Sequence, residues 1–487
     1  MLSNPSGRGL SRRRLVGLSV AAAATGPLAG LGPAHAAAAS AATVTVFASG
    51  ADRIIGREFV GLAYEKYALT ERLFTAANTD LVGLFRSLGP GLLRVGGATV
   101  DMFIWTPGGQ GRTHRQIAPA DVDALAGFLR ATGWRCLYGI NLAGASTNAT
   151  SPAMAADEVR YATGALGPSL AGIEIGNEPE FYGAGGYFPE ETWTFQTYET
   201  LWRSFRDTIV HINPKVAISG PGCVSRIGDW TAPFAVAQKG RLHMVTQHYY
   251  RGNGLDGGAT AANLITPDTR LPGYLDALKR AGWGAAAPVR ITEGNSYYSG
   301  GAPGVSNAYA SALWVIDFLF TCALGDASGV NLQGGGVSAY TPIADQADAV
   351  VDVRPCFYGL KLFQLAGRGR VLPTAIRAGG RNVSAYAVAA DDGSLRLVLV
   401  NKDLGQDLDV AVALPRPAGR ATALSLEQRS PGASGPSLTA TSGVRLQGAT
   451  IGLDGHWTPD AAEVVPVADG QLKVRLPRLS AVLVTVS

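Results

Sequence analysis

The stretch Gly172-Ile173-Glu174-Ile175-Gly176-Asn177-Glu178-Pro179-Glu180 decides how the rest of the chain is interpreted. Its first half has the apolar character of a buried strand, which ends at the permissive Gly176. Pro179 prevents the strand from continuing, because proline has no N–H for a ladder and restricts the residue before it. The chain therefore leaves the sheet at Asn177 and Glu178, so that an amide and a carboxylate stand at the carboxyl end of a strand.

A second stretch repeats this arrangement. Pro288-Val289-Arg290-Ile291-Thr292-Glu293-Gly294-Asn295 is another apolar strand that ends in a glutamate followed by a glycine. One terminal glutamate is weak evidence for a site, but two in matching context indicate a shared one.

Short apolar strands alternate with amphipathic helical segments over roughly 300 residues, which is typical of parallel βαβ units. The helical segments include 120–132, 195–212 and 308–324. Eight candidate strands lie at 59–64, 92–96, 136–142, 170–175, 216–220, 244–248, 289–292 and 329–332. Eight such units predict a closed (β/α)8 TIM barrel, in which catalytic groups stand at the carboxyl ends of the strands. An open nucleotide-binding sheet is disfavoured, because no glycine-rich phosphate loop follows the first strand.

The pattern changes after about residue 370, where alternating strands replace helical periodicity. Two of them flank Asp391-Asp392-Gly393, a hairpin signal. The predicted strands are 382–389, 394–400, 408–414, 421–426, 471–476 and 481–486. They favour a C-terminal antiparallel β-sandwich, and we expect the isolated strand at 43–47 to pair into it.

The N-terminus reads as a targeting segment. Arg12-Arg13-Arg14 precedes an apolar run over 15–31, and Ala34-His35-Ala36 resembles a cleavage site. The paired arginines predict export by the twin-arginine route, to a secreted or periplasmic location. A membrane anchor is the alternative, but the run is short and interrupted by Gly and Pro, and no other window indicates stable membrane insertion.

The predicted domains are therefore a signal peptide at 1–36, an N-terminal strand region at 37–55, a catalytic barrel at 56–365 and a sandwich at 366–487.

Charge and cysteine content exclude several classes of function. The predicted leader carries four arginines and no acid, so its removal brings the formal net charge from +4 to zero. A neutral chain has no general bias toward nucleic acid. The four cysteines lack CxxC spacing, which favours buried thiols over a disulfide framework. No cluster has metal-ligand spacing along the sequence, so we expect neither metal nor cofactor.

In this barrel Glu178 ends strand four and Glu293 ends strand seven, and both project into one mouth. Glycoside hydrolysis needs two carboxyl groups that flank one bond, and a retaining pair lies about 5–5.5 Å apart. The two glutamates together therefore indicate a carbohydrate substrate.

These residues resemble the retaining clan A glycosidases and, within that clan, glycoside hydrolase family 79, the β-glucuronidases and heparanases. The resemblance is carried by Leu93-Arg94-Val95-Gly96-Gly97 with Asp101, by Gly176-Asn177-Glu178-Pro179, by His248-Tyr249-Tyr250 and by the segment from Glu293 to Pro303. The Asn-Glu pair identifies only the clan, whereas Tyr298-Ser299-Gly300-Gly301-Ala302-Pro303 is more specific. The fold that the resemblance implies is the same barrel and sandwich.

The resemblance implies a role for each site residue. Glu178 would be the general acid/base and Glu293 the nucleophile. Asn177 would bond the sugar 2-hydroxyl, Tyr250 would donate to Glu293, and His248 would bind the substrate. The carboxylate of a uronic acid would bind Tyr298, the Gly300 amide, and Tyr340 with the loop Gly334–Gly336. Glu65 and Asp101 would accept hydrogen bonds from sugar hydroxyls. Gly294 and Asn295 depart from the heparanase pattern, so hydrogen bonds near the nucleophile are expected to differ.

Two alternatives remain open on the sequence. A different enzyme of the clan, such as an arabinofuranosidase or a xylosidase, would keep both glutamates without needing Tyr298 and Tyr340. A non-catalytic carbohydrate-binding protein would keep only the barrel. The sequence leaves the aglycone, exo or endo cleavage, and the oligomeric state undetermined.

Overall fold

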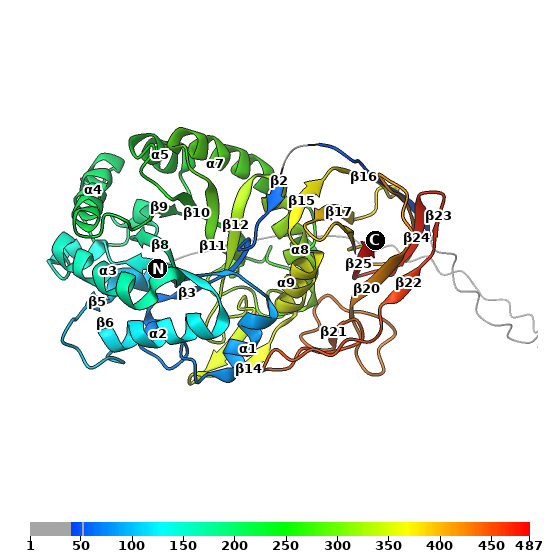
Figure 1. Ribbon diagram of the computed structural model, residues 1–487, viewed down its shortest axis with the longest axis horizontal. Helices are drawn as coiled ribbons and strands as arrows, with labels where there is room; N and C mark the ends of the chain where they lie inside the picture. The colour runs from blue at the N-terminus through cyan, green and yellow to red at the C-terminus, as the bar shows by residue number, and fades with distance from the viewer. Residues whose placement is uncertain (1–39, 51–52) are drawn as a thin grey trace, which may run out of the picture. The chain divides into compact units, whose positions relative to one another are not determined.

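Eight parallel strands close into a barrel in the computed structural model, which describes residues 40–50 and 53–487 (Figure 1). In chain order the strands are β3 (Val60–Glu65), β4 (Leu92–Gly96), β7 (Arg135–Ile140), β8 (Leu170–Ile175), β9 (Ile218–Cys223), β10 (Met244–Asn253), β11 (Val289–Tyr298) and β12 (Ala327–Gln333). Each pairs with the next, and β12 closes the ring on β3. The predicted barrel is confirmed, with β8 and β11 as its fourth and seventh strands.

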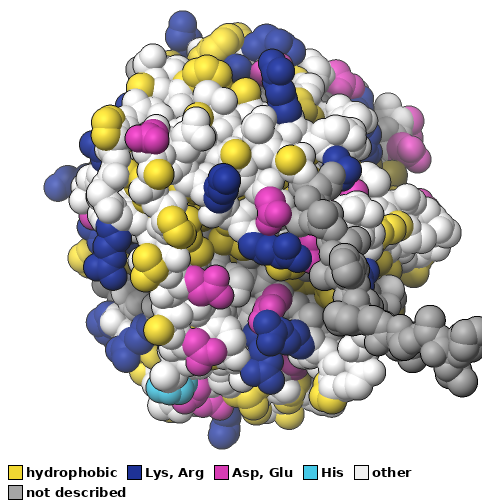
Figure 2. Space-filling view, turned by 90° about the vertical axis from the view of Figure 1, so that its right-hand side faces the viewer, with side chains coloured by type: hydrophobic (Ala, Val, Ile, Leu, Met, Phe, Trp, Pro, Cys, Tyr) yellow, Lys and Arg dark blue, Asp and Glu magenta, His cyan; other side chains and the backbone are white. Residues whose placement is uncertain are grey.

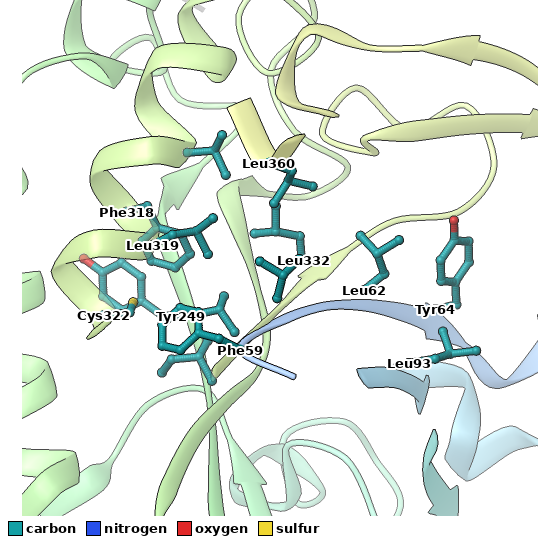
Figure 3. Close-up of a cluster of buried hydrophobic side chains, with 14 of the residues drawn as sticks. Phe59, Leu62, Tyr64, Leu93, Tyr249, Phe318, Leu319, Cys322, Leu332 and Leu360 are labelled. Carbon is teal, nitrogen blue, oxygen red and sulfur yellow. The ribbon is translucent and has the colours of Figure 1, made fainter. Parts of the chain in front are cut away.

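Helices surround the barrel (Figure 1). They are α1 (Thr79–Ser87), α2 (Pro119–Thr132), α3 (Pro152–Leu166), α4 (Phe195–Ile212), α5 (Ala232–Ala237), α6 (Ala261–Leu264), α7 (Leu271–Ala285), α8 (Tyr309–Leu324) and α9 (Pro355–Ala366). Side-chain caps start several of them, as Ser151 does for α3 and Thr194 for α4. The helices bury the apolar outer faces of the strands: Leu62 and Leu332 share a buried cluster with Leu319 and Leu360 (Figure 3).

Two further sheets form the predicted sandwich. One has the order β2 (Arg53–Ile55), β15 (Gly369–Leu372), β17 (Val383–Ala390), β18 (Leu395–Asn401), β25 (Ser480–Val486), β20 (Ala421–Gln428), β21 (Val444–Leu446), with β22 (Glu463–Val465) also on β20. The other has the order β16 (Thr374–Arg377), β1 (Ser40–Val46), β19 (Leu408–Ala413), β24 (Gln471–Leu476), β23 (Val467–Ala468). A separate hydrophobic cluster, with Val44, Leu397 and Val412 among its members, draws on both sheets. The sandwich fold is confirmed.

The N-terminal strand β1 joins this sandwich as expected, but one of its two pairings is parallel. It runs antiparallel to β16 and parallel to β19. The sequence did not indicate the short strands β2, β15, β16 and β21. It also did not indicate the parallel pair β5 (Ile104–Trp105) with β6 (Gln116–Ile117) or the antiparallel hairpin β13 (Ile343–Gln346) with β14 (Ala349–Val353). The domain boundaries stay predictions, and the leader lies outside the described residues.

Other sequence-based expectations concern surface and thiols. Acidic and basic side chains are interspersed on the visible part of the face in Figure 2. Within the described residues, no helix combines the length and hydrophobicity that crossing a membrane requires. All four cysteines are buried free thiols.

Candidate active site

Glu178 stands where the chain turns sharply out of β8. Its backbone is left-handed, with φ 47° and ψ 51°, which is uncommon for a residue other than glycine. Gly176, two residues earlier, has φ +82°, and a Cβ there would lie 2.6 Å from the Tyr182 hydroxyl. The Glu178 N–H donates to Gly222 O at 2.9 Å, which fixes the turn against the neighbouring strand. Backbone strain of this kind is often stored at functional sites.

Glu293 lies in β11 opposite His248 of β10. The register between these strands shifts between Gln247 and His248, immediately before this pair. The next residue must be small, because a Cβ on Gly294 would lie 2.6 Å from Tyr249 O. The irregular pairing therefore sets where Glu293 and His248 stand.

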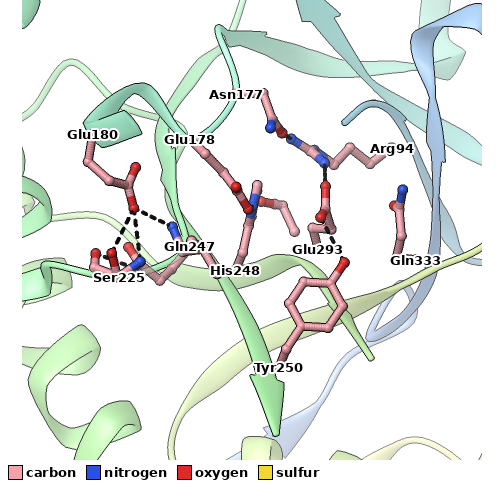
Figure 4. Close-up of polar contacts among 12 residues, drawn as sticks. Arg94, Asn177, Glu178, Glu180, Ser225, Gln247, His248, Tyr250, Glu293 and Gln333 are labelled. Atoms are coloured by element: carbon pink, nitrogen blue, oxygen red, sulfur yellow. Dashed lines mark hydrogen bonds and ion pairs between the residues drawn. The ribbon is translucent and has the colours of Figure 1, made fainter. Parts of the chain in front are cut away.

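The two predicted glutamates meet at the barrel mouth. Three atoms lie within 4.8 Å of one another: a carboxylate oxygen of Glu178, a carboxylate oxygen of Glu293 and a ring nitrogen of His248. Glu293 accepts a hydrogen bond from Arg94 Nη1 at 2.7 Å and one from the Tyr250 hydroxyl at 2.8 Å (Figure 4). Burial raises the pKa of Glu293, but the nearby His248 and Arg94 and the Tyr250 hydrogen bond outweigh it, so the net pKa is lowered.

Arg94 is a central site residue to which the sequence analysis assigned no role. Its guanidinium is fully buried and also donates from Nε to Glu174 at 2.6 Å and from Nη2 to Asn177 Oδ1 at 2.8 Å. Thr292 completes the group by donating to the other oxygen of Glu174. A signal was present: Arg94 and Glu174 are lone charges inside apolar strands, and buried charges need partners.

His248 lies behind Glu178 rather than on the cavity wall. Its Nδ1 is 2.9 Å from Glu178 Oε1, and the ring is fully buried. Burial lowers the pKa of His248, but Glu293 and the hydrogen bond with Glu178 outweigh it, so the net pKa is raised. Its Nε2 is buried without a hydrogen-bond partner in the described part of the chain.

A cavity of about 960 Å³ opens above the glutamate pair. Eight of the ten predicted site residues line it: Glu65, Asn177, Glu178, Tyr250, Glu293, Tyr298, Gly300 and Tyr340. Gln333 also lines it and was not predicted; its Nε2 donates to Glu65 Oε1 at 3.2 Å. The other oxygen of Glu65 accepts from the Thr99 N–H and hydroxyl, so this carboxylate is already held in place.

Asp101 does not line the cavity, so the prediction that it binds sugar hydroxyls is wrong. One oxygen accepts from the N–H groups of Leu142 and Ala143, and the other accepts from the Tyr182 hydroxyl. Burial raises the pKa of Asp101 to about 6 despite these bonds. The carboxylate therefore holds the loops after β7 and β8 together.

The glycine-rich loop also differs from expectation. The Gly335 N–H donates to the Thr341 hydroxyl and the Gly336 N–H to the Asp345 carboxylate, so these amides are already bonded within the protein and are not free to bind a uronate carboxylate. Tyr340 is held differently, because its N–H donates to Gly300 O and its carbonyl accepts from Asn295 Nδ2. The loops after β11 and β12 are thereby joined at the cavity.

Within residues 40–50 and 53–487, the group with metal-ligand spacing is the Glu178–His248–Glu293 cluster itself. Arg94 donates to one oxygen of Glu293 and Tyr250 to the other, so a cation there would compete with both donors.

Known proteins with similar sequences are of the kind that the motifs indicated. No model of a protein family matches the chain. The chain is 24% identical over 346 residues to a β-glucuronidase from Aspergillus niger, a match that covers 63% of each protein. It is 24% identical over 368 residues to heparanase-like protein 3 from Arabidopsis thaliana, covering 67% of this chain and 65% of the relative. The chain thus matches slightly less than two thirds of each relative's length.

Solved structures share the whole fold. A 4-O-α-L-rhamnosyl-β-D-glucuronidase from Fusarium oxysporum 12S superposes with a TM-score of 0.71 at 18% identity, over 91% of this chain and all of that one. The GH51 arabinofuranosidase from Xanthomonas axonopodis pv. citri gives 0.64 at 16% identity, over 92% and all of the two chains. The predicted resemblance is confirmed: in sequence this chain is similar to β-glucuronidase and heparanase-like proteins, and in fold it is similar to glycoside hydrolases with a barrel and a sandwich.

Proposed function

We propose that this protein is a retaining glycoside hydrolase that cleaves β-glucuronides. The observation that carries the proposal is the carboxylate pair of Glu178, which follows β8, and Glu293, which lies within β11. A carboxylate oxygen of one lies within 4.8 Å of a carboxylate oxygen of the other. Retaining enzymes hold such groups about 5–5.5 Å apart, whereas inverting enzymes leave about 6.5–9.5 Å for a water. Oxygens this close leave little room for the water that an inverting pair holds between its carboxyl groups, which favours double displacement.

In this reaction Glu293 is the nucleophile and Glu178 the acid/base. Arg94 and Tyr250 hold Glu293 as an oriented carboxylate. Glu178 gives its proton to the leaving oxygen while a Glu293 oxygen bonds to C1. A water then attacks C1, Glu178 takes its proton, and the ester to Glu293 breaks. His248 hydrogen-bonds Glu178 and acts as a positioning residue.

Asn177 is suited to bind the sugar 2-hydroxyl. Arg94 donates to its Oδ1, so the amide nitrogen is the group left to donate to the substrate. A bond to the 2-hydroxyl strengthens in the transition state. Glu65, which lines the same cavity, would accept from further sugar hydroxyls.

The uronate carboxylate would bind on the β11–β12 side, at Tyr298, the Gly300 amide and Tyr340. All three line the cavity, and the Tyr340–Gly300 hydrogen bond holds the two loops together. Tyrosine hydroxyls and an amide supply neutral hydrogen-bond donors for the carboxylate. The names of the sequence relatives, a β-glucuronidase and a heparanase-like protein, support this choice of sugar.

An arabinofuranosidase-type activity is the second candidate, because the arabinofuranosidase named above has the same fold.

The test is hydrolysis of p-nitrophenyl β-D-glucuronide beside the β-glucoside, β-xyloside and α-L-arabinofuranoside. We expect glucuronide turnover that Glu293→Gln abolishes and that Glu463→Gln, an exposed sandwich control, preserves. Tyr340→Phe should raise KM for the glucuronide. Turnover of a neutral sugar alone would contradict the uronate assignment, and activity that survives in Glu293→Gln would contradict the nucleophile.

We further propose export through the twin-arginine leader, which rests on the sequence alone. Replacing Arg12 and Arg13 by lysine should retain the precursor in the cytoplasm, as fractionation and mass determination of the processed protein would show.

A further inference from the structure

A second cavity, of about 220 Å³, lies between the barrel and the sandwich and shares no lining residue with the catalytic cavity. Its barrel side comes from the segment between β10 and α7 and from α8, and its sandwich side from β17 and from Lys402, which follows β18. Thr266 and Pro272 stand exposed at its rim, where it opens to solvent. We call it the junction cavity.

The barrel side of the junction cavity is mainly apolar. Trp314 and Phe318 of α8 stack on each other there, with ring centroids 5.0 Å apart and planes 14° apart. Leu264 and Leu271 line the cavity beside them. This side therefore offers a flat apolar surface to a ligand.

The sandwich side carries a buried polar network. The Lys402 ammonium, whose side chain is only 2% exposed, donates to Asp317 and, at 2.6 Å, to the Ser384 hydroxyl. The Tyr386 hydroxyl donates to the other oxygen of Asp317 at 3.0 Å. An ammonium has three N–H donors and a carboxylate has about four acceptor sites, so the network keeps one donor and further acceptors for a ligand.

Charge and size narrow the class of ligand. Two positive and two negative side chains line the cavity: Arg251, Lys402, Asp268 and Asp317. These charges balance, so a charged ligand would find no net counter-charge, whereas a hydroxyl group can donate to one side chain and accept from another. The volume is below the roughly 300–1,000 Å³ of sites for drug-sized ligands, which favours a single ring.

Tyr249 separates the two cavities. Its ring lines the catalytic cavity and stacks on Phe318, with centroids 6.1 Å apart (Figure 3). Its hydroxyl donates to Asp268 of the junction cavity at 2.6 Å. A ligand in the junction cavity would therefore leave the catalytic cavity open.

We propose that the junction cavity binds one neutral sugar ring, whose apolar face packs on Trp314 and whose hydroxyls bond Lys402 and Asp317. A sugar has both an apolar face of C–H groups and hydroxyls that donate and accept, which is the combination that the two sides of the cavity present. Because those sides belong to the barrel and to the sandwich, a sugar that binds only the folded protein stabilises it.

The test is isothermal titration calorimetry of the full chain with D-glucose. We expect one saturable site. Thr266→Trp places a bulky ring at the opening and should weaken binding at least about tenfold, as should the double variant Lys402→Met, Asp317→Leu, which removes the polar contacts. The double variant replaces both members of the buried ion pair, which protects the fold. Thr200→Trp, at an exposed position on α4 that lines neither cavity, is the matched control and should bind as the parent does.

Two further measurements test the class of ligand. Cyclohexanol, a six-membered ring with one hydroxyl, should bind at least about tenfold more weakly than D-glucose, because it lacks most of the hydrogen bonds. D-glucose at about ten times its Kd should raise the Tm of the parent and of Thr200→Trp, but not that of the double variant.

No saturable binding of D-glucose would overturn the proposal. Binding that Thr266→Trp and the double variant both leave unchanged would overturn it too, because the sugar would then lie outside the junction cavity. Tighter binding of cyclohexanol would replace the sugar by an apolar ligand, and tighter binding of xylotetraose would contradict a site for one ring. None of these measurements depends on turnover of a glucuronide, so this site and the proposed function are tested separately.

Discussion

At the scale of single residues, Arg94 connects the groups on which the proposed reaction depends. One buried guanidinium donates to Glu174, Glu293 and Asn177. It stands between two carboxylates, so its charge offsets part of the cost of burying a second acid beside the nucleophile. Because Arg94 donates to Asn177 Oδ1, the amide nitrogen of Asn177 is the end left to bind substrate.

We predict that Arg94→Gln shifts the acidic limb of the kcat/KM profile to higher pH. The nucleophile must be ionised, and the lowered pKa of Glu293 keeps it so as pH falls. Without the guanidinium that pKa rises, by about 1–3 units for loss of one adjacent charge, so activity disappears at a higher pH. A pH–rate profile measures the shift. Arg203→Gln, an exposed position on α4, is the matched control, and an unmoved limb in Arg94→Gln would contradict this role.

The same substitution affects stability with a definite sign. A carboxyl with a lowered folded pKa contributes stability above its unfolded pKa and loses it as pH falls through the folded value. Arg94→Gln should remove that contribution near neutral pH and cost about 3–5 kcal/mol, because it leaves buried carboxylates unpaired. Urea unfolding of both proteins at pH 7 and pH 4 measures it, and the difference between them should shrink at the lower pH.

The two glutamates could be placed at the barrel mouth from the sequence, because the residues around each of them mark the end of an apolar run. Glu178 and Glu293 each follow an apolar run, and the barrel brings the ends of such runs to one mouth, whereas Tyr250 was assigned only through the family resemblance. Asp101 was misassigned because the sequence does not show which donors a loop carboxylate meets, here Leu142, Ala143 and Tyr182. Gln333 was missed because an amide at a strand end carries no distinctive signal.

At the scale of elements, the irregular pairing of β10 with β11 positions the site. The register shift next to His248 sets this residue opposite Glu293, and Gly294 allows the two backbones to approach. The apolar strand β8 and the apolar first part of β11 were predictable from composition, but β11 continues from the predicted end at Thr292 to Tyr298. Strands of two to four residues, such as β15 and β16, were not, because pairing rather than periodicity defines them.

We predict that Gly294→Ala displaces Glu293 and lowers kcat more than it raises KM. The new Cβ would lie 2.6 Å from Tyr249 O and 3.2 Å from Ile291 Cγ2, so a strand must shift. Misplacement of a reacting group by about 1 Å costs about 10²-fold in rate, and overpacking costs about 1–3 kcal/mol. Steady-state kinetics and thermal unfolding measure the two effects. Gly164→Ala in α3, where a Cβ meets nothing within 4 Å, should leave kcat unchanged and stability equal or slightly higher. Full activity in Gly294→Ala would contradict the close-approach argument.

At the scale of the whole molecule, the barrel and the sandwich share one hydrophobic core over the described residues. The cluster that holds Leu62 and Leu332 of the barrel also holds Val398 and Leu483 of the eight-stranded sheet. Tyr309, at the start of α8, is fully buried and donates to the carbonyls of Leu426 and Leu479. A continuous core and a buried polar contact across the junction favour unfolding of both parts together.

We predict that Tyr309→Phe destabilises barrel and sandwich by the same amount. The change keeps the ring but removes the donor of two buried carbonyls, at a cost of about 1–3 kcal/mol. Seven of the eight tryptophans precede residue 315, so their fluorescence mainly follows the barrel, while circular dichroism follows both parts. The two urea transitions should coincide in the parent and shift together in the variant, because a contact at the junction stabilises whatever unfolds with it. Tyr161→Phe, whose hydroxyl contacts Asp123 at the surface of the barrel, should shift neither measurably. Separate transitions, with only the circular dichroism signal moving in Tyr309→Phe, would mean that the sandwich unfolds independently and that the shared cluster does not couple the two parts.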